Sequence, residues 1–77
     1  MKIFSNIVRK ILDDYKKEGK KITQQELANA LKISRQGFTN KMTRDTFTID
    51  DVVTIADYLG MKVILKGINE YIIEKED

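Results

Sequence analysis

Hydrogen-bonding side chains are concentrated between residues 35 and 40. Arg35 can donate two parallel hydrogen bonds to O6 and N7 of guanine, and the Gln36 amide can pair with N6 and N7 of adenine. Thr39 and Asn40 follow one turn later if this segment is helical, and Gly37 would let the backbone approach a groove closely. The pattern predicts contacts with base edges of duplex DNA, and Arg35 and Gln36 are the first candidates for these contacts. A polar face that is merely solvated is the alternative interpretation.

The composition gives little support to catalysis or metal binding. The 77 residues include no Cys and no His, which removes thiolate and imidazole groups as nucleophiles, bases and metal ligands. Carboxylates and hydroxyls are present, but no motif gathers them into a nucleophile, a base and an oxyanion site. Asp50 and Asp51 look like a catalytic pair, yet the preference of helix starts for negative charge already explains them. We therefore expect no enzyme, no cofactor, no metal and no small-molecule ligand.

Charge is divided unevenly along the chain. Residues 1–44 contain eleven Lys or Arg and four Asp or Glu, a net charge of +7, whereas residues 45–77 contain three Lys and eight Asp or Glu, a net charge of −5. This polarity suggests that the first half faces a polyanion and that the second half faces away from it. A surface rich in Lys only for solubility is the alternative.

The first residues resemble neither a signal peptide nor a membrane span. Lys2 is followed by an amphipathic pattern that Ser5, Asn6 and Arg9 interrupt, and no apolar run reaches the roughly 20 residues needed to cross a bilayer. We expect a cytoplasmic protein without a membrane segment.

The elements that must position Arg35 and Gln36 are helices. Apolar residues at three- and four-residue spacing indicate an amphipathic helix over residues 2–18, and Gly19 ends it. Thr23 and Glu26 have the spacing of a capping box, in which each side chain bonds a free amide at a helix start. A short second helix is therefore predicted to begin at Thr23.

Two further helices follow. Ser34 is a suitable N-cap for a third helix that runs to about Thr43, so that a very short turn separates it from the second. Residues 43–47 read as a loop. Thr48 and Asp51 then repeat the spacing of a capping box, which predicts the start of a fourth helix.

After Gly60 the pattern changes from helix to strand. Two short, β-branched segments separated by Gly67-Ile68-Asn69-Glu70 predict a β-hairpin. The expected fold is mainly α, a bundle of four helices with a C-terminal β-hairpin. Residues 1–60 form the helical domain, and residues 61–77 form a hairpin extension that is a possible dimerisation element.

Residues 23–42, TQQELANALKISRQGFTNKM, resemble the helix-turn-helix of the lambda-repressor and Cro-type (XRE-like) family of DNA-binding proteins. Residues 47–60 resemble the core helix that follows it in that family. The resemblance implies a sequence-specific transcriptional regulator, expected to be a repressor of phage or bacterial origin, that inserts the helix over residues 34–43 into the major groove of double-stranded DNA.

The resemblance also implies contacts with the DNA backbone. Gln24, at the start of the second helix, corresponds to a position that bonds a phosphate, and a helix N-terminus suits that role. Cations and hydroxyls that flank the third helix can neutralise or bond phosphates without reading sequence. The further candidates for backbone contacts are Ser34, Lys41, Arg44, Thr46, Lys20 and Lys21.

Two positions depart from the family pattern. Lys32 stands in the turn where the family usually has Gly, so a left-handed backbone there would cost on the order of 1 kcal/mol. Lys41 stands where many members have an apolar residue, and Met42 is expected to take over its packing. A shift of this kind could tilt the third helix and change which side chains reach the groove.

A homodimer on a palindromic operator is expected, because one helix-turn-helix reads too little DNA for strong specificity. The hairpin is the candidate contact, through Val63, Leu65, Tyr71 and Ile73. An exposed hairpin edge can add strands across a two-fold axis, although the hairpin could instead cover the core of its own chain.

A protein-binding module is the alternative function. An antitoxin-like or inhibitor domain could present the same helix or hairpin to another protein, and the acidic second half would suit a basic partner. Salt-dependent DNA binding distinguishes the two hypotheses.

Overall fold

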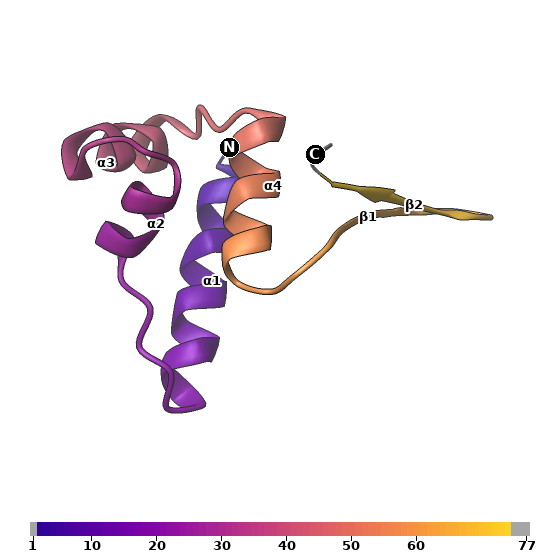
Figure 1. Ribbon diagram of the computed structural model, residues 1–77, viewed down its shortest axis with the longest axis horizontal. Helices are drawn as coiled ribbons and strands as arrows, with labels where there is room; N and C mark the ends of the chain where they lie inside the picture. Colours follow the sequence, from indigo (N-terminus) through magenta and orange to yellow (C-terminus); the bar gives the residue numbers. More distant parts are fainter. Residues whose placement is uncertain (1, 75–77) are drawn as a thin grey trace.

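The computed structural model describes residues 2–74 and contains four helices followed by one antiparallel hairpin (Figure 1). This architecture confirms the predicted mainly α fold. The last three residues of the predicted extension, 75–77, and Met1 lie outside the described residues. The elements are α1 (Ile3–Lys17), α2 (Gln24–Ala30), α3 (Arg35–Arg44), α4 (Ile49–Tyr58), β1 (Val63–Lys66) and β2 (Glu70–Ile73).

The core lies where the apolar faces of the four helices converge. Val8 of α1, Leu27 of α2, Phe38 of α3 and Ile55 of α4 are almost completely buried and belong to one cluster. Each helix thus buries one side of its amphipathic pattern and leaves the other side to solvent. Phe47, in the loop before α4, packs edge to face against Phe38, with ring centroids 5.9 Å apart.

Three helices begin at side-chain caps. The Ser34 hydroxyl accepts a hydrogen bond from the Gly37 amide at 2.9 Å, as predicted for α3. Thr48 and Asp51 form both halves of a capping box at α4. The box predicted at α2 is only half formed. The Thr23 hydroxyl accepts from the Glu26 amide at 3.1 Å.

The Glu26 carboxylate has a different partner from the one predicted. It accepts a hydrogen bond from the Tyr58 hydroxyl of α4 at 2.8 Å. This bond raises the pKa of Tyr58, because the nearby carboxylate disfavours the phenolate. The capping-box prediction was therefore wrong for Glu26, which links α2 to α4 instead of closing the start of α2.

The turn between α2 and α3 contains the strained residue that the sequence suggests. Lys32 has a φ of 60°, in the left-handed region that costs a non-glycine residue on the order of 1 kcal/mol. Its amide and that of Ile33 donate to the carbonyls of Asn29 and Ala28, each at 3.0 Å. Ile33 packs against the core, which offsets the strain.

Asp45, at the end of α3, caps the start of α1. It ends α3 in the left-handed conformation, with a φ of 54°. Its carboxylate accepts hydrogen bonds from the amides of Ile3, Phe4 and Ser5, at 2.7, 3.1 and 2.9 Å. The buried Ser5 hydroxyl donates to the Met42 carbonyl at 2.7 Å. The segment predicted as a plain loop therefore joins the ends of two helices.

Acid is expected to weaken this junction. The hydrogen bond from the Ser5 amide, with those from Ile3 and Phe4, holds the pKa of Asp45 below its ordinary value despite the opposing effect of burial. The folded state thus favours the carboxylate. The stability that the Asp45 carboxylate contributes is complete above the pKa of Asp in the unfolded chain, about 3.9. It is lost as the pH falls from there through the lower pKa of the folded state.

Asp45→Asn should therefore be less stable than the wild type at pH 7 and should lose less of its stability between about pH 5 and pH 2. The amide keeps one acceptor and tolerates the left-handed backbone, but it cannot ionise. Urea unfolding followed by circular dichroism across this pH range checks the expectation. Parallel stability profiles for the two proteins would contradict it.

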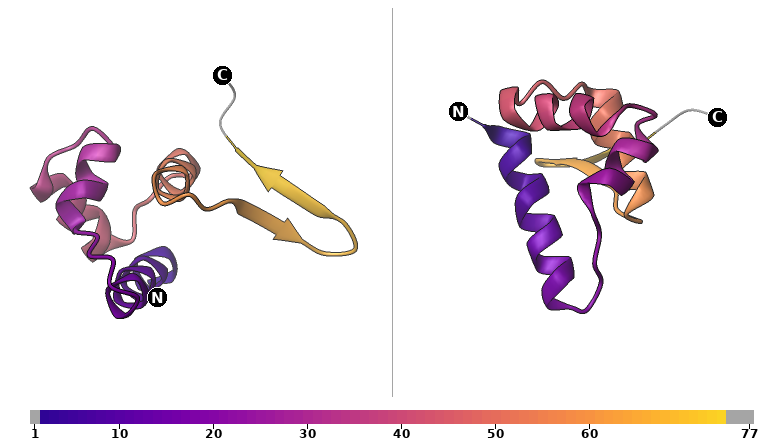
Figure 2. Two further views of the ribbon diagram at one scale, coloured as in Figure 1. Left: turned by 60° about the horizontal axis from the view of Figure 1, so that its bottom comes forward. Right: turned by 90° about the vertical axis from the view of Figure 1, so that its left-hand side faces the viewer.

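The hairpin projects from the helical body on the side of α4 away from α2 and α3 (Figures 1 and 2). Val63 pairs with Ile73 and Leu65 with Tyr71, so these four side chains share one face. Val63 and Ile73 are half-buried, whereas Leu65 and Tyr71 are exposed.

Candidate nucleic-acid interface

The outer face of α3 carries the side chains predicted to contact bases. Arg35, Gln36, Thr39 and Asn40 are all exposed, while Phe38 of the same helix is fully buried. The helix lies at the edge of the body opposite the hairpin (Figure 1) and is uncovered when that edge faces the viewer (Figure 2, right). The fold thus anchors α3 by its apolar side and presents its polar side outward.

The polar groups on this face are available for new hydrogen bonds. Within residues 2–74, Arg35 has no ion-pair or hydrogen-bond partner. Gln36 Nε2 donates to Asn40 Oδ1 at 3.2 Å. That bond leaves the Gln36 carbonyl oxygen and the Asn40 amide group free, which together offer one acceptor and one donor face to a base edge.

Gly37 faces the protein more than the solvent. A Cβ built on it would lie 3.3 Å from Ser34 Oγ and 3.7 Å from the Ile33 side chain. The absence of a side chain therefore makes room for the N-cap and the turn before α3. A base contact from Gly37 remains a prediction about its backbone.

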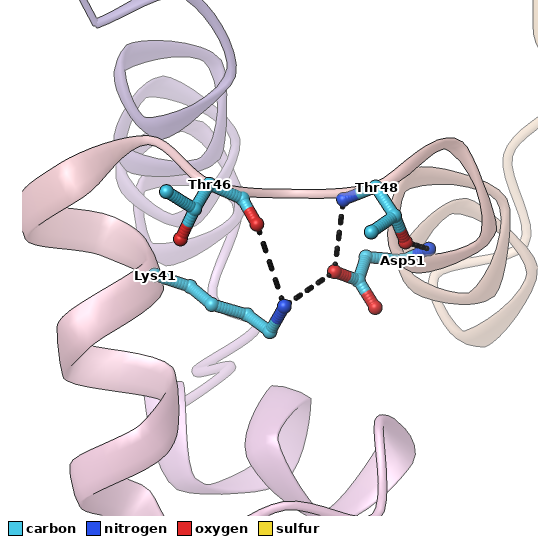
Figure 3. Close-up of polar contacts among 4 residues, drawn as sticks. All are labelled: Lys41, Thr46, Thr48 and Asp51. Atoms are coloured by element: carbon cyan, nitrogen blue, oxygen red, sulfur yellow. Dashed lines mark hydrogen bonds and ion pairs between the residues drawn. The ribbon is translucent and has the colours of Figure 1, made fainter.

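Lys41 lies beneath the outer face of α3 and reaches towards α4 (Figure 3). Its ammonium forms an ion pair with Asp51 at 2.8 Å and lies 3.4 Å from the Thr46 carbonyl. Both charged side chains are shielded, at 25% and 18% exposure. The same Asp51 oxygen accepts from the Thr48 amide at 3.0 Å. The Lys41 side chain thus ties α3 to the loop and to the start of α4.

Asp51 stays ionised in this contact. Burial by itself would raise the pKa of Asp51, but the hydrogen bond from Lys41, its positive charge and the Thr48 amide outweigh burial and lower the pKa. The predicted contact of Lys41 with a phosphate competes with this internal pair. Met42 fills the neighbouring core position at 3% exposure, as the sequence suggests.

The remaining backbone candidates lie at the two ends of α3, at the start of α2 and in the loops next to these helices. Gln24, the first residue of α2, lines a shallow depression of about 410 Å³ together with Lys21 of the preceding loop. Lys20, Arg44 and Thr46 are exposed, and neither Lys20 nor Arg44 has an ion-pair partner in the described part of the chain. The Ser34 hydroxyl is exposed and accepts only the cap bond from Gly37, so it can still donate.

Residues 7–64, about three quarters of the chain, match the family model of the bacteriophage CI repressor helix-turn-helix domain. The chain belongs to this family. It is therefore a DNA-binding transcriptional repressor domain, and the family is not enzymatic. No curated protein and no solved structure gives a significant match. Within residues 2–74, no helix is both long and apolar enough to cross a membrane.

The sequence analysis of this CI repressor domain did not identify two cations as potential phosphate ligands. Arg9 and Lys16 of α1 line the same depression as Lys21 and Gln24, so the structure brings four potential phosphate ligands together. Asp13 lies among them and pairs with Lys17 at 3.2 Å. Arg9 and Lys16 are seven residues apart, a spacing that places both on one face of a helix. That spacing could have revealed the pair, but their proximity to Gln24 depends on the tertiary fold.

The Lys41–Asp51 pair gives a prediction that separates a structural role from a phosphate contact. Lys41→Met should cost about 1–2 kcal/mol of stability, between the values for exposed and buried ion pairs, because it leaves a shielded carboxylate without its partner. The DNA binding of Lys41→Met should depend on salt as strongly as that of the wild type. Arg44→Ala, the control, should lower the slope of log K against log salt by about 1.

Urea unfolding and fluorescence anisotropy at several salt concentrations measure both quantities. A reduced salt slope for Lys41→Met, with unchanged stability, would instead assign the Lys41 ammonium to a phosphate.

Proposed function

We propose that this domain recognises a palindromic operator as a homodimer, with α3 of each copy in the major groove. The observation that supports the proposal best is the outer face of α3, where Arg35, Gln36, Thr39 and Asn40 are all exposed while Phe38 is buried. Arg and Gln near the start of such a helix suit bidentate contacts with guanine and adenine. Sequence specificity would come from these side chains, and Arg35 and Gln36 would contribute most of it.

Phosphate contacts would hold the helix in register. Cations in and around α3 would neutralise the DNA backbone, and Gln24 is the first residue of α2, where a helix start suits an anion. Lys41 is left out of this set because Asp51 holds its ammonium. The proposed backbone ligands are Gln24, Ser34, Arg44, Thr46, Lys20, Lys21, Arg9 and Lys16.

A dimer would place two α3 helices on successive turns of DNA, about 34 Å apart. The hairpin face formed by Val63, Leu65, Tyr71 and Ile73 is the proposed contact, because two of its four apolar side chains are exposed. A repressor of this kind would work where bacterial DNA lies, in the cytoplasm.

Selection from a random double-stranded DNA library tests the proposal. The purified chain would be incubated with the library at about 50 and 200 mM salt, and bound DNA would be sequenced after each round. We expect one motif with dyad symmetry, its halves centred about 10 base pairs or a multiple apart. An asymmetric single half-site would contradict the dimer. No enrichment at either salt concentration would contradict sequence-specific reading.

A further inference from the structure

An apolar groove runs between α1 and α4. Ile7 and Ile11 of α1 line one wall, and Val52 of α4 and Leu59, directly after α4, line the other. The groove encloses about 310 Å³, and Met61 stands at its lip. Ile7 is 47% exposed and Met61 is 40% exposed. Covering apolar side chains that are gathered along one open groove lowers the free energy, so such a groove marks a contact surface.

The two faces of the hairpin differ in character. One face consists of Val63, Leu65, Tyr71 and Ile73 and carries no charge; we call it the apolar hairpin face. The opposite face carries Ile64 and Ile72 together with the Lys66–Glu70 ion pair at 3.7 Å, so it is mixed in character. On the apolar hairpin face, Leu65 is 60% exposed and Tyr71 is 62% exposed. A two-stranded hairpin is marginal by itself, so this face needs a surface to pack on.

The hairpin does not fill the groove of its own chain. Figure 1 and the left-hand view of Figure 2 show the strands leading away from α1 and α4. Of the apolar hairpin face, only Val63, at the base, lines the groove. Leu65 and Tyr71 therefore remain exposed while the groove also remains open, although each has the apolar character that would cover the other.

A second copy of the chain can cover the apolar hairpin face and the groove at the same time. Each copy carries one groove and one hairpin, so a two-fold axis lets each hairpin enter the groove of the other copy in a closed, self-complementary contact. The two-fold axis forms this contact twice, and in each one Tyr71, an aromatic side chain that is 62% exposed, supplies a large apolar area. The hairpin lies on the side of α4 away from α3, which leaves α3 free.

We propose that this domain dimerises by reciprocal hairpin exchange, in which Leu65 and Tyr71 of each copy pack into the groove between α1 and α4 of the other. The inference rests on the homodimer of the proposed function and deepens it by assigning the receiving surface. It differs from a contact between the two hairpins because the groove, which lies outside the hairpin, becomes half of the interface.

Single charges introduced on each surface test the exchange. Leu65→Asp changes the hairpin, and Ile7→Asp changes the groove. Ile68→Asp is the matched control, because Ile68 is fully exposed at the hairpin turn and lies outside the apolar hairpin face. Sedimentation equilibrium should give twice the chain mass of 8.9 kDa for the wild type and the control. It should give the single mass for the other two variants, with unchanged helical circular dichroism.

Mixing the two monomeric variants gives the sharpest result. The Ile7→Asp copy keeps an intact hairpin, and the Leu65→Asp copy keeps an intact groove, so one of the two contacts can form. We expect a mixed dimer that is weaker than the wild-type dimer. Ile7→Asp remaining dimeric by itself, or a wild type that stays monomeric, would overturn the exchange. If Ile7→Asp loses helical signal, Met61→Asp at the lip of the groove replaces it.

The outcomes separate this inference from DNA recognition. A monomeric wild type that still enriches a half-site would overturn the exchange and leave base reading by α3 intact. A hairpin-exchanged dimer that enriches no DNA sequence would support the exchange and contradict the proposed function.

Discussion

Arg35→Ala combined with Gln36→Ala should weaken binding to the selected operator by about 100-fold or more and should reduce the ratio of specific to non-specific affinity. Each bidentate base contact contributes about 1–3 kcal/mol of discrimination, and 1.4 kcal/mol corresponds to a factor of ten in affinity. Both side chains are exposed, and neither packs in the core. Stability should therefore change by no more than about 0.5 kcal/mol.

Fluorescence anisotropy with operator and random duplexes measures the two affinities. The chain offers a matched control in Lys10→Ala combined with Gln25→Ala. Gln25 donates to Asn29 at 2.9 Å, four residues along α2, as Gln36 does to Asn40 in α3. Lys10 is an exposed cation that pairs with Asp14. The control should keep the wild-type ratio of affinities. A double variant of Arg35 and Gln36 that also keeps it would refute their role in base reading.

Phe38→Ala should abolish DNA binding for a different reason, the loss of the folded state. Phe38 has no exposed surface, belongs to the central cluster and packs against Phe47. Its truncation leaves a cavity that costs about 3–5 kcal/mol. That is a large share of the roughly 5–10 kcal/mol expected for a domain of this size. The melting temperature should fall by about 15–30 °C.

Thermal unfolding followed by circular dichroism measures this loss. Phe38→Leu, which removes less volume, should cost only about 1–2 kcal/mol and retain DNA binding at low temperature. A Phe38→Ala protein that melts within a few degrees of the wild type would show that the core of α3 is not essential. The contrast with Arg35, three residues earlier in α3, separates base reading from packing.

Local sequence patterns determined most of the secondary structure. Ser34 and the Thr48–Asp51 pair cap helices within three residues of themselves, so their chemistry is readable without tertiary information. The spacing of apolar residues placed Phe38 inside and Gln36 outside α3, because residues two apart in a helix with a period of 3.6 residues point to nearly opposite sides.

Only the tertiary structure decided which charged groups meet. Asp45 caps α1 from about forty residues away, Glu26 bonds Tyr58 instead of its own helix start, and Lys41 pairs with Asp51. A carboxylate can accept from any donor that the fold brings near, so sequence spacing selects its partner only within a helical turn. The open groove beside the exposed hairpin arises in the same way, because the path of the chain after Gly60 determines what each apolar face covers.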